Sequence, residues 1–202
     1  MIDASTALAR LREGNRRFVA DEAVATALSS QARRTALVAG QAPFAIVLGC
    51  SDSRVPAELV FDQGFGDLFV IRVAGNVVAP SQVGSVEFAA SMYGTRLVVV
   101  MGHTQCGAIL ATVDELLGRT STESKNLRSI VDRVRPSVET LLSGRTDGDL
   151  DALVSAAVRA NVRASVDHLR HGSELLEELV RTAGLMVVGA EYSLDTGVVT
   201  FF

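Results

Sequence analysis

The sequence predicts an α/β fold, with a mostly parallel sheet of four inner strands plus an antiparallel edge strand, helices on both faces and an N-terminal helical arm. Four apolar runs of four to six residues, each short for a buried helix, alternate with longer segments of helical pattern. Such alternation is typical of a parallel sheet covered by helices. Near the C-terminus, apolar residues alternate on both sides of residues 195–197, which indicates a hairpin and therefore an antiparallel last strand.

Length and composition indicate one domain over residues 1–202, with residues 1–40 as the arm. Hydrophobic residues make up 48% of the chain and the mean hydropathy is +0.30, so we expect some apolar surface to pack on a partner subunit. The arm could cap the sheet of its own chain or reach across to that partner. The net charge of −4 and the lack of tryptophan give no case for nucleic acid as a partner. No apolar run approaches the roughly 18 residues of a membrane span. Because a secretory signal is also lacking, we expect a cytoplasmic protein with no membrane partner.

The N-terminal part of the chain predicts two helical segments and the first strand. Residues 3–20 carry their apolar side chains near one stripe, as an amphipathic helix does. Residues 21–40 form a second, alanine-rich helical piece that ends at Gly40. The apolar run 44–49 follows Pro43 and ends in glycine, so it predicts a strand that is buried on both faces.

The next part predicts a short helix, a strand and a longer helix. Proline suits the first turn of the helix at 56–61. The segment 68–73 is mostly apolar and predicts another inner strand. A serine can cap the helix at 81–93, and Gly94 ends it. Gly84 weakens that helix, which indicates close packing at this position.

The second half of the chain continues the alternation of strands and helices. Pro136 lies within one predicted helix and is expected to kink or restart it. The predicted elements are a strand at 97–101, a helix ending at 117, helices at 127–142, 149–169 and 174–182, a loop at 145–149, a strand at 185–188 and an edge strand within 192–201.

Both cysteines of the chain lie just beyond predicted strands. Cys50 follows the strand at 44–49, and His103 and Cys106 follow the strand at 97–101. Ligands of open α/β sheets bind beyond the carboxyl ends of the strands. Two thiols and one imidazole suit Zn²⁺, and three protein ligands rather than four leave an open position typical of catalytic zinc. Two alternatives stay open at this point: inert core cysteines, and a disulfide between them.

Two charged residues follow Cys50 closely. Asp52 can reach the same cation or hold its water, and Arg54 can pair with Asp52 through two parallel hydrogen bonds. The alternative is that these residues cap the next helix or form an exposed ion pair worth little. His168 and His171 lie on a predicted surface helix and at its end, so we expect them to be solvated.

At these motifs the sequence resembles the β-class carbonic anhydrases, and the resemblance extends over nearly the whole chain. It implies zinc on Cys50, His103 and Cys106, and a catalytic dyad of Asp52 with Arg54. The matching segments are Cys50-Ser-Asp52-Ser-Arg54, His103-x-x-Cys106-Gly107, Phe61-Asp62-Gln63-Gly64, residues 68–76 and the helix that contains residues 84–89.

The resemblance also implies the reaction and the assembly. The reaction is the reversible hydration of carbon dioxide to bicarbonate and a proton, by attack of zinc-bound hydroxide that the dyad orients. In a closed low-pH state, Asp52 is the fourth zinc ligand. Two thiolates cancel the formal charge of the cation, so the pKa of the bound water should be higher than in a site of three neutral imidazoles. The rate should therefore rise into mildly alkaline pH. The implied assembly is a homodimer or a dimer of dimers, with the N-terminal helices around the partner.

The substrate-binding residues implied by the resemblance are Gln41, Phe69, Phe88 and Gly107. Phe88 stands where plant-type members have tyrosine, so a hydrogen bond from that hydroxyl is not expected. Val47 replaces a tryptophan that helps to form an inhibitory bicarbonate site in some bacterial members, and we expect this chain to lack that regulation.

Three rival functions remain on the sequence alone. A hydrolase of carbon disulfide or carbonyl sulfide would use the same zinc scaffold. A zinc-containing subunit without activity would be expected to lack Asp52, Arg54 or a ligand, but all are present. A nucleotide-binding protein is disfavoured because neither a G-x-G-x-x-G motif nor a P-loop follows any predicted strand.

Overall fold

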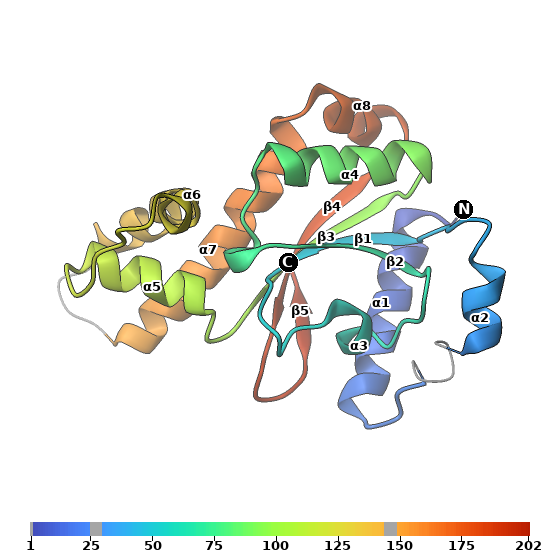
Figure 1. Ribbon diagram of the computed structural model, residues 1–202, viewed down its shortest axis with the longest axis horizontal. Coiled ribbons are helices and arrows are strands. Elements are labelled where there is room, and N and C mark those ends of the chain that lie inside the picture. The colour runs from blue at the N-terminus through green and yellow to red at the C-terminus, as the bar shows by residue number, and fades with distance from the viewer. Residues whose placement is uncertain (1, 25–29, 144–148) are drawn as a thin grey trace.

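The computed structural model describes residues 2–24, 30–143 and 149–202, and contains one five-stranded sheet with the order β2-β1-β3-β4-β5 (Figure 1). β1 to β4 are parallel, and β5 pairs antiparallel with β4, which confirms the predicted hairpin. The strands are β1 (Ala45–Gly49), β2 (Leu68–Arg72), β3 (Leu97–His103), β4 (Met186–Tyr192) and β5 (Val199–Phe201).

The position of β2 differs from the prediction. β2 forms the edge of the sheet opposite β5, so the chain has three inner strands rather than four. The apolar sequence of β2 reflects partial cover on its faces, with Val70 and Phe69 half-buried. An apolar run indicates what covers the faces of a strand, but it does not reveal whether a further strand pairs with its second edge.

The helices begin and end close to the predicted residues. Pro136 lies inside one uninterrupted helix rather than restarting it, and only 31–36 is helical among the described residues of the segment 21–40. The predicted loop at 145–149 falls almost wholly outside the described residues. The helices are α1 (Ala4–Val19), α2 (Gln31–Ala36), α3 (Ala57–Val60), the 3₁₀ turn η2 (Ala74–Asn76), α4 (Pro80–Met92), α5 (Gly107–Leu116), α6 (Lys125–Leu142), α7 (Leu150–His171) and α8 (Glu174–Thr182). None of the described helices is long and apolar enough to cross a bilayer.

Helices cover both faces of the sheet, as predicted (Figure 1). Alternate residues of a strand point to opposite faces. Val47 of β1 packs in the cluster that contains Leu11 of α1, whereas Ile46 packs with α4, α7 and α8. A third cluster joins α5, α6 and α7 beside Cys50 and Cys106. Because these three clusters surround β1 and β3, the carboxyl ends of both strands lie among buried side chains.

α1 packs on the sheet of its own chain. A Cβ atom at Gly14 would lie 1.8 Å from the carbonyl oxygen of Phe61, so the helix backbone approaches this loop as closely as a glycine allows. The buried Asn15 donates to the carbonyls of Val60 and Gly197 and accepts from the backbone amide of Val199. α1 therefore connects α3 with the β4–β5 hairpin. That residues 1–40 also pack on a partner remains a prediction.

The expectation of close packing at Gly84 is wrong within the described chain. Beyond the adjoining backbone of α4, no described heavy atom lies within 4 Å of a Cβ built at Gly84, whereas a Cβ at Gly102 of β3 would lie 2.6 Å from a methyl of Val162. Glycine in a helix identifies a weak position, but which glycine meets a neighbour depends on how the elements pack.

Candidate metal centre

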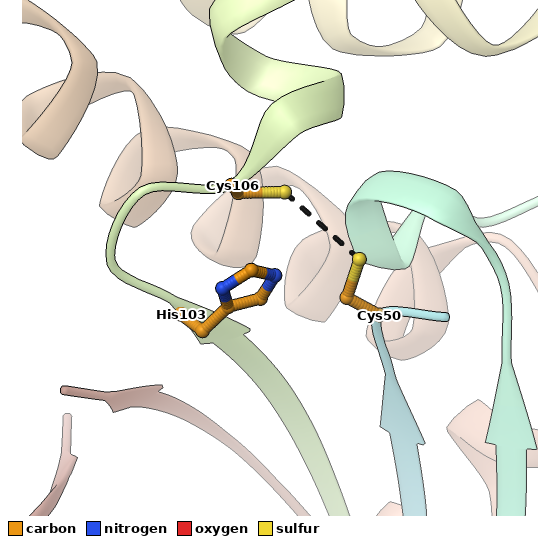
Figure 2. Close-up of side chains that lie close together, drawn as sticks. All are labelled: Cys50, His103 and Cys106. Atoms are coloured by element: carbon orange, nitrogen blue, oxygen red, sulfur yellow. Dashed lines mark hydrogen bonds between the residues drawn. The ribbon is translucent and has the colours of Figure 1, made fainter. Parts of the chain in front are cut away.

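The carboxyl ends of β1 and β3 bring the predicted metal-binding residues together (Figure 2). The two strands are adjacent and parallel, and Gly49 pairs with Met101. Cys50 follows β1 directly and His103 is the last residue of β3. Cys106 is the N-cap residue of α5. Strand pairing alone therefore places three side chains, separated by up to 56 residues in sequence, at one edge of the sheet.

The three side chains form a compact, buried group. One potential ligand atom from each lies within 4.8 Å of the other two, and the sulfurs are 3.9 Å apart. Cys50, His103 and Cys106 are 5%, 0% and 1% exposed. Both cysteines are free, so the disulfide alternative is wrong. Figure 2 shows the sulfurs and the imidazole converging on one another, which an inert core would not require.

His103 has one satisfied and one unsatisfied ring nitrogen. Nδ1 lies 2.9 Å from the carbonyl oxygen of Thr104 and can donate to it, while Nε2 is buried with no hydrogen-bond partner. Burying such a nitrogen without a partner costs about 1–3 kcal/mol. With its proton on Nδ1, the imidazole presents the lone pair of Nε2, as metal-binding histidines do. The donor set therefore fits a zinc ion.

The sulfurs of Cys50 and Cys106 lie within hydrogen-bonding distance of each other, and either can be the donor. The hydrogen bond with Cys106 lowers the pKa of the Cys50 thiol to about 4. The same bond, together with burial, raises the pKa of the Cys106 thiol. One sulfur is thus readily ionised, and ionising the second beside it needs a compensating positive charge. A bound divalent cation supplies that charge and displaces the remaining proton.

Asp52 forms a two-pronged ion pair with Arg54. Arg54 Nε donates to Oδ1 at 2.9 Å and Nη2 donates to Oδ2 at 2.7 Å. These bonds hold the pKa of the Asp52 carboxyl well below its ordinary value. Oδ2 also lies 3.9 Å from His103 Nε2. The alternative of a helix cap is wrong, because α3 has Pro56 at its N-cap and receives no side-chain cap bond.

The loop after β1 is held by a residue that the sequence analysis missed. Arg72 ends β2 beside Gly49; its Nε donates to the carbonyl of Cys50 at 2.9 Å and its Nη2 to that of Asp52 at 2.5 Å. In the sequence, Arg72 could have been recognised as the single charged side chain of an otherwise apolar strand. Its acceptors, the carbonyls of the loop after β1, come within reach because β2 pairs parallel with β1, and a single sequence does not specify that pairing.

The structure separates the remaining predicted residues into two places. Gly107 is the first residue of α5, directly after Cys106. Phe69 lies farther from the centre. It pairs with Ile46 of β1, whereas Arg72, three positions and about 10 Å further along β2, pairs with Gly49 beside Cys50. Gln41 precedes β1, at the end of the strand opposite Cys50.

Gln41, Phe69 and Phe88 meet one another around Tyr93. Gln41 Nε2 donates to the Tyr93 hydroxyl at 3.0 Å. The rings of Phe69 and Phe88 lie 6.1 and 5.7 Å from that of Tyr93, centroid to centroid. Phe88 is 47% exposed, so this group faces outward. Within one chain, therefore, these three residues form an aromatic group apart from the metal-binding side chains.

The other histidines take no part in the centre. His168 and His171 are exposed on the last turn of α7, as predicted. Among the described residues, the Cys50–His103–Cys106 group is the one found with three or more side chains arranged to hold a metal ion.

Comparison with known proteins gives consistent matches. Residues 45–199 match the family model described as carbonic anhydrase. Carbonic anhydrase 2 of Mycobacterium tuberculosis is 40% identical over 187 residues, which is 93% of this chain and 87% of the relative. A carbonic anhydrase of Mycolicibacterium smegmatis is 38% identical over the same shares of both chains.

Solved structures agree with the fold. The β-carbonic anhydrase CafA of Aspergillus fumigatus has a TM-score of 0.77 at 26% identity, and the match covers 98% of this chain and 89% of that chain. The Coccomyxa β-carbonic anhydrase in complex with acetazolamide has a TM-score of 0.75 at 25% identity, covering 99% and 86%.

Proposed function

Because the chain belongs to the β-class carbonic anhydrase family, we propose that it hydrates carbon dioxide reversibly to bicarbonate and a proton at the Cys50–His103–Cys106 centre, with zinc as its cofactor. One observation supports this most directly. Three buried donor atoms lie within 4.8 Å of one another, and one of them, His103 Nε2, has no hydrogen-bond partner. The free cysteines fit a reducing compartment, and we propose the cytoplasm.

The protein supplies the ligands and the surroundings of the metal. Zinc bound to two sulfurs and one imidazole lowers the pKa of a water molecule and supplies hydroxide near neutral pH, less strongly than in a site of three neutral histidines. The carbonyl of Thr104 fixes the ring of His103. Gly107 opens α5 beside Cys106, where its backbone amide is not required by the helix and can donate to an oxygen of the substrate.

Asp52 orients the attacking hydroxide in this proposal. Its carboxylate accepts the hydroxide proton in a hydrogen bond, which directs an oxygen lone pair at carbon dioxide. Arg54 holds the carboxylate in place and keeps it ionised. In the proposed closed state at low pH, Asp52 leaves Arg54 and takes the position of the hydroxide. Because the pKa of Asp52 is held well below its ordinary value, protonation of this carboxylate does not contribute to the pH dependence of the rate at pH 6–9.

The proposal is tested by metal content and by stopped-flow hydration of carbon dioxide. We expect about one zinc per chain and a rate that rises between pH 6 and pH 9, because the nucleophile forms by loss of a proton. Protein purified without a transition metal, or a metal-loaded protein without hydratase activity, would refute the proposal. Hydrolysis of carbon disulfide or carbonyl sulfide in place of hydration would favour the alternative use of the same zinc scaffold.

Loss of the Arg54 side chain should impair catalysis and leave the metal in place. For Arg54→Ala we expect kcat to fall by about 10²-fold, in the range of a lost positioned catalytic group. The reason is that Asp52 loses both side-chain hydrogen bonds and is free to turn toward the metal. The measurement is kcat together with zinc content. The exposed Arg181 of α8 provides a control for loss of one positive charge, since Arg181→Ala should retain wild-type turnover. Wild-type turnover of Arg54→Ala would exclude the dyad.

We further propose a homodimer, or a dimer of dimers, in which Gln41, Phe69 and Phe88 serve the centre of the partner subunit. Within one chain these residues lie at the wrong end of the sheet to reach their own metal centre. They adjoin exposed apolar surface, with Phe88 47% and Met92 67% exposed, that a second subunit would cover. Residues 1–40 are proposed to contact the same partner.

A charge at Phe88 should separate the subunits. For Phe88→Glu we expect a monomer by sedimentation and a fall in kcat/KM of more than about tenfold, because burying an unpaired carboxylate is costly. Zinc content should stay near one per chain, since Phe88 is remote from the ligands of its own chain. Leu127→Glu, a change at an exposed leucine of α6, is the matched control and should keep the assembly. A fully active monomeric Phe88→Glu variant would contradict a partner-completed site.

A further inference from the structure

The 3₁₀ turn after β2 donates a hydrogen bond to the sulfur of Cys50. The backbone amide of Gly75 lies 3.4 Å from Cys50 Sγ, within the range of an N–H···S bond. Gly75 and Asn76 both have left-handed backbone angles, with φ of 67° and 43°. Glycine adopts this conformation freely, and asparagine does so more readily than most other residues, so the sequence suits this turn.

α7 contacts both residues of this turn. The buried Asn161 donates from Nδ2 to the carbonyl oxygen of Gly75 at 2.8 Å. One turn further along α7, Ser165 Oγ donates to the carbonyl oxygen of Asn76 at 3.1 Å. Asn161 is 2% exposed and is 86 residues from Gly75, so the bond is a tertiary contact rather than local turn chemistry.

The same face of α7 also abuts the strand that carries His103. A Cβ at Gly102 would lie 2.6 Å from Val162 Cγ2 and 3.2 Å from Val158 Cγ1. In Figure 1, α7 runs alongside β3 and β4 on the face opposite α1. α7 is therefore in contact with both segments that bear metal ligands: the Cys50 side through Gly75, and the His103 side through Gly102.

We propose that Asn161 is a positioning residue of the metal centre, which acts through Gly75 to fix the direction of the Cys50 sulfur and so sets the affinity for zinc. This inference rests on the proposed metal centre. The chain of bonds is Asn161 Nδ2 to the Gly75 carbonyl, and Gly75 N–H to Cys50 Sγ. Metal affinity depends on such outer hydrogen bonds because they hold a ligand in its binding direction before the metal arrives.

The test compares zinc affinity in the full-length protein by competition with a chromophoric chelator. Asn161→Leu keeps the number and connectivity of the side-chain heavy atoms and removes the donor. Its zinc dissociation constant should rise about 10-fold, the lower end of the effect of losing a direct partner of a ligand, because Asn161 acts through Gly75. Ser165→Ala is the matched control: it removes a buried bond from the same helix face, but to the carbonyl of Asn76, which does not lead to Cys50. Its affinity should stay within about threefold of the wild type.

A second readout follows the sulfur itself. In the cobalt-loaded protein, the thiolate-to-metal charge-transfer absorption should shift in Asn161→Leu and stay unchanged in Ser165→Ala, since only the first alters the hydrogen bond on Cys50. If Asn161→Leu does not fold, as judged by circular dichroism of the zinc-loaded protein, Asn161→Ala takes its place.

The outcomes separate this inference from the function on which it depends. If the wild type binds no zinc, the proposed function fails. If the wild type binds zinc tightly and the Asn161 variants bind it equally well, only the role of Asn161 is refuted. Equal weakening by Asn161→Leu and Ser165→Ala, with the same cobalt spectrum in both, would also refute it, because the effect would then be general to α7.

Discussion

Replacing Cys50 with serine is expected to abolish tight zinc binding and to lower kcat/KM for carbon dioxide hydration by about a thousandfold, or about 4 kcal/mol of transition-state stabilisation. The hydroxyl of serine is neutral at neutral pH and a poor ligand for zinc, whereas the pKa of Cys50 is already lowered to about 4 in the metal-free chain. The remaining donors, His103 and Cys106, are too few to hold the ion at catalytic occupancy.

The measurement is zinc per chain after dialysis, followed by stopped-flow kinetics on the same samples. Ser51→Ala changes the exposed neighbour on the same loop and should retain both zinc and activity. The secondary structure of Cys50→Ser should be close to that of the wild type by circular dichroism, because the sheet and its three core clusters do not depend on this one sulfur. A Cys50→Ser protein that keeps one zinc and at least a tenth of the activity would remove Cys50 from the ligand set.

A methyl group at Gly14 is expected to be among the most destabilising changes in the molecule. In Gly14→Ala the new Cβ would lie 1.8 Å from the carbonyl oxygen of Phe61, far inside van der Waals contact. Because that atom belongs to the backbone, α1 has to move away from the loop. The movement would break the hydrogen bonds of Asn15 and uncover the face of the sheet beneath Leu11. We expect a loss of about 3 kcal/mol in the free energy of unfolding, at the upper end for overpacking.

Urea denaturation, at equal protein concentrations so that any subunit association is the same, measures this loss. Ser155→Ala is a control, because it changes an exposed side chain in the interior of α7, away from the surface proposed for the partner. Helix propensity predicts that this variant gains up to about 0.5 kcal/mol. If Gly14→Ala were as stable as the wild type, the packing of α1 on the Phe61 loop would be wrong.

Several features of the protein were predictable because they depend on local patterns. The apolar runs that became β1, β3 and β4 were recognisable from length and boundaries alone. The hairpin at β4–β5 was recognisable from its turn residues, and Gly197 there has the positive φ of 73° that such turns favour. The metal-binding group was predictable from a simple rule. Residues just beyond neighbouring parallel strands meet at one edge of the sheet, and both cysteines of the chain stood in that position.

The arrangement of Asp52 was open on the sequence alone. A carboxylate two residues from a ligand can bind the metal, cap a helix or pair with a nearby cation, and the spacing suits all three. The structure shows the paired form, because Arg54 presents two donors to both carboxylate oxygens. The motif therefore specified the residues, while the conformation of the loop determined which atoms meet.

By itself, the sequence determined the fold class and the order of strands and helices along the chain, since these are encoded in periodicity and in turn residues. Position relative to the strand ends identified the three side chains of the candidate metal centre, but it left inert cysteines and a disulfide as alternatives until the family resemblance was considered. Only the tertiary structure decided that β2 lies at an edge, that Gly14 rather than Gly84 is a close contact, that Gln41, Phe69 and Phe88 gather away from the centre, and that Asn161 supports the turn at Gly75. These features depend on which surfaces approach each other across tens of residues of intervening chain. That approach results from the packing of all the elements together, and no local run of residues encodes it.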